Sequence, residues 1–458
     1  MAGIGFVLRN LTRRDDLMGL VSGYGYSALV ATGPWIFTSL ALGGSLYAGS
    51  AFTTWEEQAA FRLIIIYNFA FSLVFSGPVI MVVTRYLADM VYKRDVKEVP
   101  GMVMGALTLL MLIQVPVAVP FYMFFVDLEP ITRVLAVINF FLINGIWLTG
   151  VFLSALKDFN PIIRTFGIGM VLGMILNVFF SEQYGMSGML TGFNLGLGYI
   201  FFSLMARILS EYPYRPVRPF AFLRYFRIYW ELALGGFIYN LGAWIDKIIM
   251  WTAPESETVL SHMVSYPDYD SAMFLAFLTI IPAMSSFVIS METSFFENYL
   301  TFYRDIQRHA PWERIDKNHK VMMAGVMESG RNFLILQGSI SLTAIMLAPN
   351  IFDWLGVNYL QMSMFRIGVL GSFYHAMALF FMILLAYFDF RRVTLGIQTL
   401  FFVTNAGFTY ITLQLGFPYY GYGYFLSTLV TFSATYWVSF KLVKDLPYQT
   451  FVKQNASV

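Results

Sequence analysis

Small and polar residues form a stripe along the apolar segment 228–252. Its members are spaced i, i+4, i+8, i+11 and i+15, which places them on one helical face: Glu231, Gly235, Tyr239, Gly242 and Asp246. A charged side chain in mid-bilayer costs about 2.5–3.5 kcal/mol on insertion scales, so such a face usually meets water or a partner. The stripe predicts a cavity lining in which Asp246 binds substrate or a coupling ion. The alternative is a structural ion pair at Asp246.

The apolar segment 271–296 carries a second polar face. Its hydroxyl and acidic residues follow helical spacing and include Ser286, Ser290, Thr293 and Glu297, with Glu292 nearby. This face is expected to line the same path. The alternative is that the hydroxyl groups bond only to their own helix.

Other titratable residues within apolar segments could gate a path or carry an ion. Arg85 and Asp89 lie one helical turn apart and predict either a gate or an interfacial ion pair. Lys247 follows Asp246 but is expected outside the stripe. His375 has a side chain suited to proton relay, or it is held by a hydrogen bond to a neighbouring helix.

Two glycine-proline pairs interrupt apolar segments: Gly33-Pro34 and Gly77-Pro78. Proline removes a helical hydrogen bond, and the freed carbonyl needs another donor within a membrane. The pairs predict hinges that bend during transport. The alternative is fixed kinks that shape helix packing.

Signatures of enzymes and cofactors are missing from the sequence. No phosphate-binding loop, nucleophile elbow or zinc-binding motif occurs, and there is no cysteine. Asp268 and Asp270 form an Asp-x-Asp pair, but they are expected in a solvated acidic loop spanning 253–270. A net charge of +2 argues against nucleic-acid binding. We therefore expect no catalytic residues, no metal and no cofactor.

Apolar segments long enough to cross a bilayer fill the chain from Leu17 to Val443. With 58% hydrophobic and 12% charged residues, the chain is expected to be an all-α membrane protein. Twelve spans are predicted near 17–48, 59–90, 100–125, 131–156, 161–181, 187–210, 228–252, 271–296, 331–349, 362–388, 394–415 and 419–443.

Basic residues predict the orientation. Of the 29 Lys and Arg residues, all but four fall in the segments that are cytoplasmic if the N-terminus is cytoplasmic. The four exceptions are Arg62, Arg133, Lys247 and Arg366. Both termini are therefore predicted to be cytoplasmic.

The spans divide into two groups of six, which predicts two six-helix bundles of the kind that repeat-built transporters use. The expected divisions are an N-terminal bundle at 1–210, a cytoplasmic connector at 211–227, a C-terminal bundle at 228–443 and a cytoplasmic tail at 444–458.

The longest predicted cytoplasmic loop, 298–330, is too short for a catalytic domain and is rich in basic residues. Arg304, Arg308 and Arg314 make it a predicted docking surface for a cytosolic partner, together with the connector.

Several sequence blocks resemble one family. They are MAGIGFVLR at residues 1–9, GYGY at 23–26, TGPW at 32–35, NGIWLTG at 144–150 and FDFRR at 388–392. They are similar to the PelG family, the inner-membrane transporter subunits of bacterial Pel exopolysaccharide systems, and the likeness extends over the whole chain. It implies the multidrug/oligosaccharidyl-lipid/polysaccharide (MOP) exporter superfamily, with two MATE-like bundles around a central cavity.

The resemblance also implies partners and a substrate. The partners are a PelF-like cytosolic glycosyltransferase and PelD-like and PelE-like membrane proteins. The substrate is an N-acetylgalactosamine-rich, partly deacetylated and therefore cationic polysaccharide, which Glu231, Asp246 and Glu292 would suit. No catalytic or ion-binding residue follows from the resemblance.

The sequence thus predicts a polysaccharide exporter of the bacterial inner membrane that is not an enzyme. One alternative is an ion-coupled flippase for lipid-linked oligosaccharide, or a drug antiporter, with Asp246 or His375 carrying the ion. A second is a non-conducting scaffold for a glycosyltransferase complex.

Overall fold

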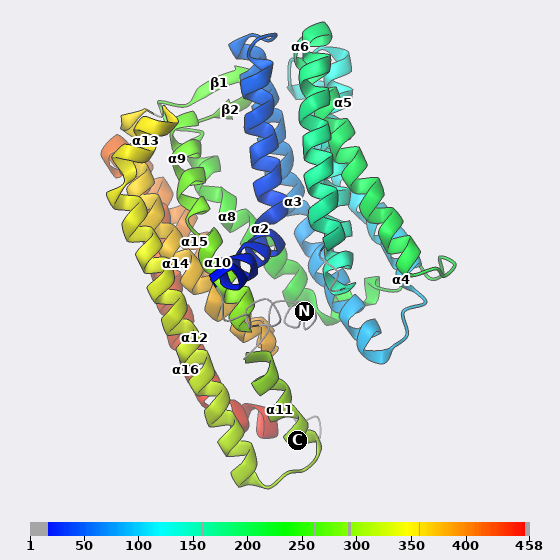
Figure 1. Ribbon diagram of the computed structural model, residues 1–458, viewed down its shortest axis with the longest axis vertical. Coiled ribbons are helices and arrows are strands. Elements are labelled where there is room, and N and C mark those ends of the chain that lie inside the picture. The colour runs from blue at the N-terminus through cyan, green and yellow to red at the C-terminus, as the bar shows by residue number, and fades with distance from the viewer. Residues whose placement is uncertain (1–16, 157–159, 261, 292–294, 357, 454–458) are drawn as a thin grey trace. The chain divides into compact units, whose positions relative to one another are not determined.

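The computed structural model describes residues 17–156, 160–260, 262–291, 295–356 and 358–453. In these residues the chain is almost entirely helical and forms two compact units (Figure 1). The N-terminal unit comprises Thr32–Trp244 and Trp251–Pro267. The C-terminal unit comprises the described part of Met1–Ala31, with Ile245–Met250 and Asp268–Val458. The boundary between the units therefore falls inside two helices, α2 and α8.

Apolar runs account for the long helices of the N-terminal unit. They are α2 (Leu17–Gly49, from Thr32 onward), α3 (Trp55–Lys93), α4 (Val99–Pro120) with the π-helical turn η1 (Phe121–Phe125), α5 (Pro130–Leu156), α6 (Asn160–Glu211), the short α7 (Leu223–Ile228) and α8 (Trp230–Met250, up to Trp244). A capping box starts α3, because the Thr54 side chain accepts from the Glu57 amide while Glu57 accepts from the Thr54 amide. Helix α3 packs against α4, α5 and α6.

Helix α6 consists of two arms that meet at Gly185. The backbone there has φ +53° and ψ −131°, a conformation that favours glycine. The arms approach closely: a Cβ on Gly196 would lie 2.5 Å from the Gly169 carbonyl oxygen. The small-residue spacing of these glycines therefore allows direct contact between helix backbones.

The C-terminal unit is built from the remaining helices. They are α9 (Pro267–Leu278, from Asp268), α10 (Ile281–Ser290), α11 (Phe296–Gln307), α12 (Trp312–Met346), α13 (Ala348–Leu355), the 3₁₀ turn η3 (Tyr359–Gln361), α14 (Met362–Tyr387), α15 (Arg391–Leu415), the 3₁₀ turn η4 (Phe417–Tyr419), α16 (Tyr422–Lys444), α17 (Leu446–Tyr448) and the π-helical turn η5 (Gln449–Lys453). Helix α16 packs against both α14 and α15. Phenylalanines fill the core, where Phe287, Phe333 and Phe380 contact one another.

Residues 253–270 are only partly the solvated acidic loop that the sequence predicts, since Glu255 and Glu257 are exposed but the segment has regular structure. They contain an antiparallel hairpin, β1 (Glu257–Leu260) and β2 (Met263–Ser265), followed by the start of α9. Tyr67 of α3 holds the hairpin, since its hydroxyl donates to the Val264 carbonyl at 2.7 Å and accepts from the Val264 amide at 3.1 Å. The Tyr67 ring also stacks on Trp251. These contacts to α3 replace solvent for part of the segment.

Helices occupy the segments predicted as spans, with differences at their ends. Among the described residues, six helices are long and apolar enough to cross a membrane, or up to seven if α12 and α13, which are bent by 63°, are counted as one span. The count of twelve spans stays a prediction. The predicted loop 298–330 is mostly helical, because α11 and the first half of α12 occupy it.

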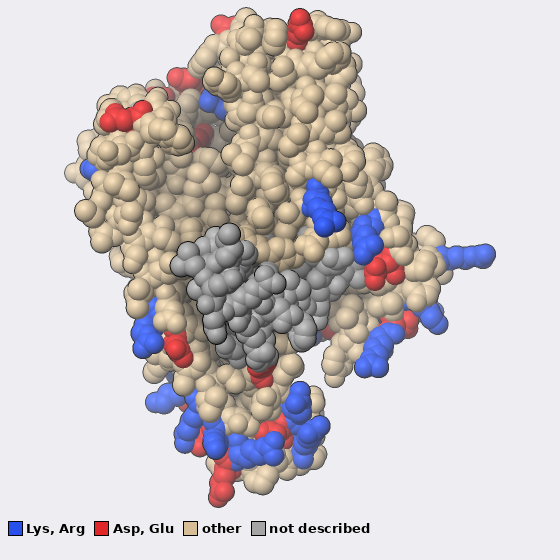
Figure 2. Space-filling view, viewed as in Figure 1, with Lys and Arg blue, Asp and Glu red and all other residues tan. Residues whose placement is uncertain are grey.

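Basic side chains gather near one helix end or turn in each unit, together with some acidic ones. In the N-terminal unit, Lys93 and Arg94 lie at the end of α3, whereas Glu56 and Glu57 lie at its start. In the C-terminal unit, basic residues gather at the turn between α11 and α12, which Figure 2 shows as blue side chains. We call these the basic ends. The cytoplasmic placement of the basic ends and of the termini stays a prediction.

Candidate transport site

Asp246 and Lys247 form a buried ion pair in the C-terminal unit. The Lys247 Nζ lies 3.2 Å from Asp246 Oδ1 and 3.0 Å from Oδ2, and the Asp246 side chain is fully buried. Although consecutive residues diverge by about 100° around a helix, the lysine chain is long enough to fold back onto its neighbour. Lys247 therefore joins the polar cluster at Asp246, contrary to the expectation that it lies apart.

Aromatic residues from two other helices complete the surroundings of the pair. The Tyr269 hydroxyl of α9 donates to Asp246 Oδ2 at 3.0 Å. The Lys247 ammonium lies over the Phe277 ring, 5.2 Å from its centroid, and 6.0 Å from that of Tyr424. Cation–π contacts of this kind stabilise a desolvated ammonium.

His375 lies in the same polar cluster. Its Nδ1 is 3.0 Å from the Tyr424 hydroxyl of α16, and its ring packs edge-on against Phe401 of α15. The sequence allowed two alternatives for His375, proton relay and a hydrogen bond to a neighbouring helix. The structure contains the hydrogen bond. We refer to Asp246, Lys247, Tyr269, His375 and Tyr424 as the charge cluster.

The rest of the α8 stripe belongs to the N-terminal unit. Glu231 is buried with 6% exposure, and Tyr239 is half-buried. The unit boundary between Trp244 and Ile245 separates both from Asp246. Their role in lining a path stays a prediction.

The second predicted polar face lies only partly in the described structure. Ser286 of α10 is half-buried, while the Ser290 side chain and all of Glu292 lie outside the described residues. Next to Ser286, the backbone carbonyl of Ser285 accepts a hydrogen bond from the Ser27 hydroxyl of α2 at 2.8 Å. This bond ties the first part of α2 to the C-terminal unit.

The Asp-x-Asp pair starts α9 and is half-buried rather than solvated. Asp268 accepts from Gln361 Nε2 at 2.7 Å, and the same Gln361 accepts from the Ser271 hydroxyl at 2.8 Å. The residue between the two acids, Tyr269, points to Asp246. The pair therefore belongs to the packing of α9. Among the described residues, no group of three or more His, Cys, Asp and Glu could hold a metal ion.

The two proline pairs occupy different environments. Gly33-Pro34 follows directly after the point in α2, between Ala31 and Thr32, where the chain passes from one compact unit to the other. Gly77 lies in a tight contact, since a Cβ there would be 2.6 Å from the Gly236 carbonyl oxygen. The Leu73 carbonyl, one turn before Gly77, accepts from Ser76 and Asn240. Helix packing therefore accounts for Gly77, and the hinge role of both pairs stays a prediction.

Arg85 and Asp89 interact with the chain that follows α6. Their side chains are 3.6 Å apart, Asp89 accepts from the Tyr225 hydroxyl at 2.9 Å, and Arg85 lies over the Tyr229 ring. Burial, together with the Asp89 carboxylate, raises the pKa of Tyr225, which keeps the phenol a neutral donor. These contacts favour the interfacial pair, while a gate stays a prediction.

The three arginines predicted to dock a partner are not equivalent. Arg304 of α11 and Arg308, which follows the end of that helix, are both exposed. Arg314 of α12 donates from Nε to Asp305 Oδ2 at 3.0 Å, and Asn318 donates to the same oxygen at 2.5 Å. Because Asp305 is buried, this bond network fixes α11 to α12. We call these two helices, from Phe296 to Met346, the basic hairpin.

Sequence reasoning missed a chain of buried amides in the N-terminal unit. Tyr122 of η1 donates to Asn68 of α3 at 2.6 Å, Asn68 donates to Asn139 of α5 at 2.8 Å, and Asn139 donates to Asn194 of α6 at 2.7 Å. The four residues lie in different helices, so no periodicity within one helix reveals them. Polar side chains in four apolar spans were the available signal.

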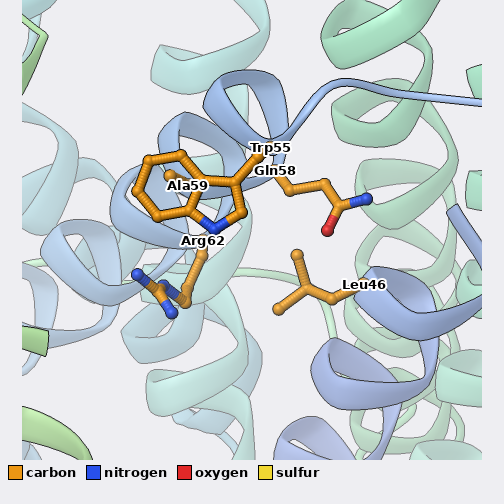
Figure 3. A pocket seen from close by; sticks show the side chains of 5 residues that line it. All are labelled: Leu46, Trp55, Gln58, Ala59 and Arg62. Carbon is orange, nitrogen blue, oxygen red and sulfur yellow. The ribbon is translucent and has the colours of Figure 1, made fainter. Parts of the chain in front are cut away.

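A small cavity of about 60 Å³ opens near the start of α3 (Figure 3). Trp55, Gln58, Ala59 and Arg62 line it from α3, and Leu46 lines it from α2. The cavity has room for a few water molecules.

Comparison with known proteins decides the family. Residues 1–451 match the family PelG, described as "Putative exopolysaccharide Exporter (EPS-E)". The chain belongs to the PelG family. The match includes nearly the whole chain, and no curated protein shows significant sequence similarity to it.

Solved structures of MOP superfamily transporters share the fold of this chain. A MOP superfamily transporter from Pyrococcus furiosus has a TM-score of 0.63 at 13% identity, over 92% of this chain and 96% of that chain. A multidrug resistance MATE family transporter gives 0.60 in an outward-facing conformation and 0.61 in an inward-facing one, both at 13% identity. These matches cover 92% of this chain and 96% and 99% of those chains.

The family and the fold confirm the main predictions from sequence. This chain is an all-α membrane protein with the fold of MATE-like transporters, and its family is one of exopolysaccharide exporters. Family and fold are both those of transporters rather than enzymes. Membership also implies an exopolysaccharide system with further components.

Proposed function

We propose that this PelG family member exports nascent Pel polysaccharide, an N-acetylgalactosamine-rich polymer, across the bacterial inner membrane. The observation that carries the proposal is the family match over residues 1–451. The MATE-like fold supports it, because that fold belongs to transporters. A PelF-like cytosolic glycosyltransferase supplies the polymer, and PelD-like and PelE-like membrane proteins complete the system.

The polymer path follows the α8 stripe. Glu231 and Tyr239 are a carboxylate and a phenol on one helical face, suited to a cationic or hydroxyl-rich chain. Asp246 contributes less directly, because Lys247 and Tyr269 already occupy its oxygens. Ser286, Ser290 and Glu292 are further residues that we propose to contact the polymer.

Polymer synthesis, rather than an ion gradient, drives the export. A coupling ion needs carboxylate oxygens that it can reach, and those of Asp246 are engaged by Lys247 and Tyr269. His375 is held by Tyr424 in the same way. These contacts disfavour the ion-coupled flippase and the drug antiporter.

The basic hairpin docks the glycosyltransferase. Arg304 and Arg308 offer exposed charge at the C-terminal end of α11, and the Asp305 network holds that helix in a fixed orientation. Rim charges of this kind govern encounter and register with a partner. We expect Arg304→Glu with Arg308→Glu to release the enzyme from membranes, because both arginines lie outside the Asp305 network.

The matched control for docking is Lys93→Glu with Lys97→Glu, which makes the same charge change at the basic end of the N-terminal unit. The control protein should retain the glycosyltransferase in co-purification. Equal retention by both proteins would place docking elsewhere.

An export assay in inverted vesicles tests the proposed function itself. Vesicles that contain this protein and the glycosyltransferase receive a nucleotide-activated sugar, and polymer inside them is measured with and without a proton gradient. Export that survives collapse of the gradient supports polymer-driven transport. Export that is lost with the gradient supports the ion-coupled alternative, and polymer that stays outside the vesicles identifies a scaffold.

A further inference from the structure

The chain between α6 and α8 combines exposed arginines with exposed apolar rings. Residues 212–230 contain four arginines and no acidic residue, and all four arginines are exposed: Arg215, Arg218, Arg224 and Arg227. Several large apolar side chains of the same segment are also exposed: Tyr214, Val217, Phe220, Leu223, Ile228 and Trp230. We call residues 212–230 the arginine strap.

The backbone of the arginine strap is fixed to the start of α4. A Cβ on Gly101 would lie 2.0 Å from the Val217 carbonyl oxygen, and one on Gly105 would lie 1.8 Å from that of Pro219. Glycines at these two positions therefore let the strap lie directly on the helix.

Buried side chains complete the attachment. Phe222 is fully buried, and Tyr225 bonds to Asp89 at the end of α3. Arg218 pairs with Glu98, which also accepts from the Tyr86 hydroxyl at 2.6 Å. Because α3 ends and α4 begins beside the strap, and both helices are long and apolar enough to cross a membrane, we expect the strap to lie where these two spans leave the bilayer.

The outward side chains of the strap match the chemistry of a membrane surface. Arginine binds phosphate through charge-assisted, bidentate hydrogen bonds. Aromatic rings are enriched at the headgroup level, where one end of each ring is apolar and the other is wet. Basic and aromatic residues together characterise segments that lie in the interface of anionic bilayers.

We propose that the arginine strap binds the phosphate groups of anionic phospholipids at the basic end of the N-terminal unit. Arg215 and Arg227 make the principal contacts, because they have no ion pair within the described parts of the chain, whereas Arg218 is paired with Glu98. The exposed rings insert beside them. A lipid is favoured over a protein partner because the ends of two spans hold the strap at headgroup level.

Native mass spectrometry of the full-length protein tests the proposal. The protein in detergent receives phosphatidylglycerol or phosphatidylcholine with the same acyl chains, and retained lipid is counted. We expect preferential retention of phosphatidylglycerol. Arg215→Gln with Arg227→Gln should weaken that retention about 10- to 30-fold, the effect of removing two arginines from an anionic surface. Arg215→Lys with Arg227→Lys should keep most of it.

The control is Arg304→Gln with Arg308→Gln, the same charge change on the basic hairpin, and it should leave phosphatidylglycerol retention unchanged. Equal retention of the two lipids, or unchanged retention by the Arg215→Gln, Arg227→Gln protein, overturns the proposal. So does displacement by soluble glycerol phosphate at similar concentration, which indicates a free phosphate site. Loss of the glycosyltransferase with unchanged lipid retention identifies the strap as a protein-docking surface and also overturns it.

Discussion

The ammonium group of Lys247 lies 3.0 Å from the carboxylate of Asp246, its neighbour in the sequence. Both charges are held within one turn of α8, where the carboxylate is fully buried and the lysine side chain is 11% exposed. Removing one partner of a buried ion pair destabilises a protein more than replacing both partners by apolar residues, because the remaining charge stays buried without a partner.

Lys247→Met should therefore destabilise the protein by about 3–5 kcal/mol, since it leaves Asp246 buried beside a single hydroxyl donor. Asp246→Asn with Lys247→Met should recover most of the loss. The measurement is the melting temperature of the full-length protein in detergent. A single variant as stable as the native protein would show that the pair contributes no stability.

Cysteine labelling can test whether the α8 stripe faces water. The chain has no native cysteine, so a single introduced thiol reports its own position. Gly242→Cys, on the stripe, should react with a membrane-impermeant thiol reagent added from one side. Trp244→Cys, about 200° away around the helix, should not react. Equal labelling at both positions would show that the stripe does not line the path.

Replacing Pro34 should slow export without lowering protein levels. Alanine restores a backbone donor and straightens α2. The change acts just beyond the position where α2 passes from one compact unit to the other. Pro78→Ala is the comparison, because it adjoins the tight contact between Gly77 and Gly236. Polymer export per unit of transporter is the readout, and a normal rate for the Pro34→Ala protein would reduce that proline to a packing feature.

Removing Asn139 from the amide chain should lower the stability of the N-terminal unit. Its loss leaves both Asn68 and Asn194 short of a partner, and interhelical hydrogen bonds in membranes contribute about 0.6–2 kcal/mol each. Asn139→Ala should therefore lower the melting temperature more than Tyr122→Phe, which removes one bond at the end of the chain. A lower melting temperature for Tyr122→Phe than for Asn139→Ala would contradict the central position of Asn139 in the amide chain.

The sequence predicted the helices well where apolar runs end sharply. The segments 362–388 and 394–415 agree with α14 and α15 to within three residues, because Asp389, Arg391 and Gly416 mark their limits. It predicted less where tertiary contacts decide the structure. The β1–β2 hairpin depends on Tyr67, which lies almost 200 residues away.

The candidate site shows the same division. Helical spacing alone placed Asp246 among small and polar residues. It could not place Lys247, whose side-chain path depends on Phe277 and Tyr424 from other helices. Likewise, the sequence alone does not distinguish Arg314 from Arg304 and Arg308. The difference is the bond from Arg314 to Asp305, which only the structure shows.

The boundary between the compact units has a consequence for dividing the protein into fragments. A chain severed at residues 211–227 would leave the larger part of the C-terminal unit on one fragment and the start of α2, with Ser27, on the other. Neither fragment would then contain all the residues of the C-terminal unit. Complementation between co-expressed fragments should therefore fail when residues 1–31 are omitted, even though those residues come first in the sequence.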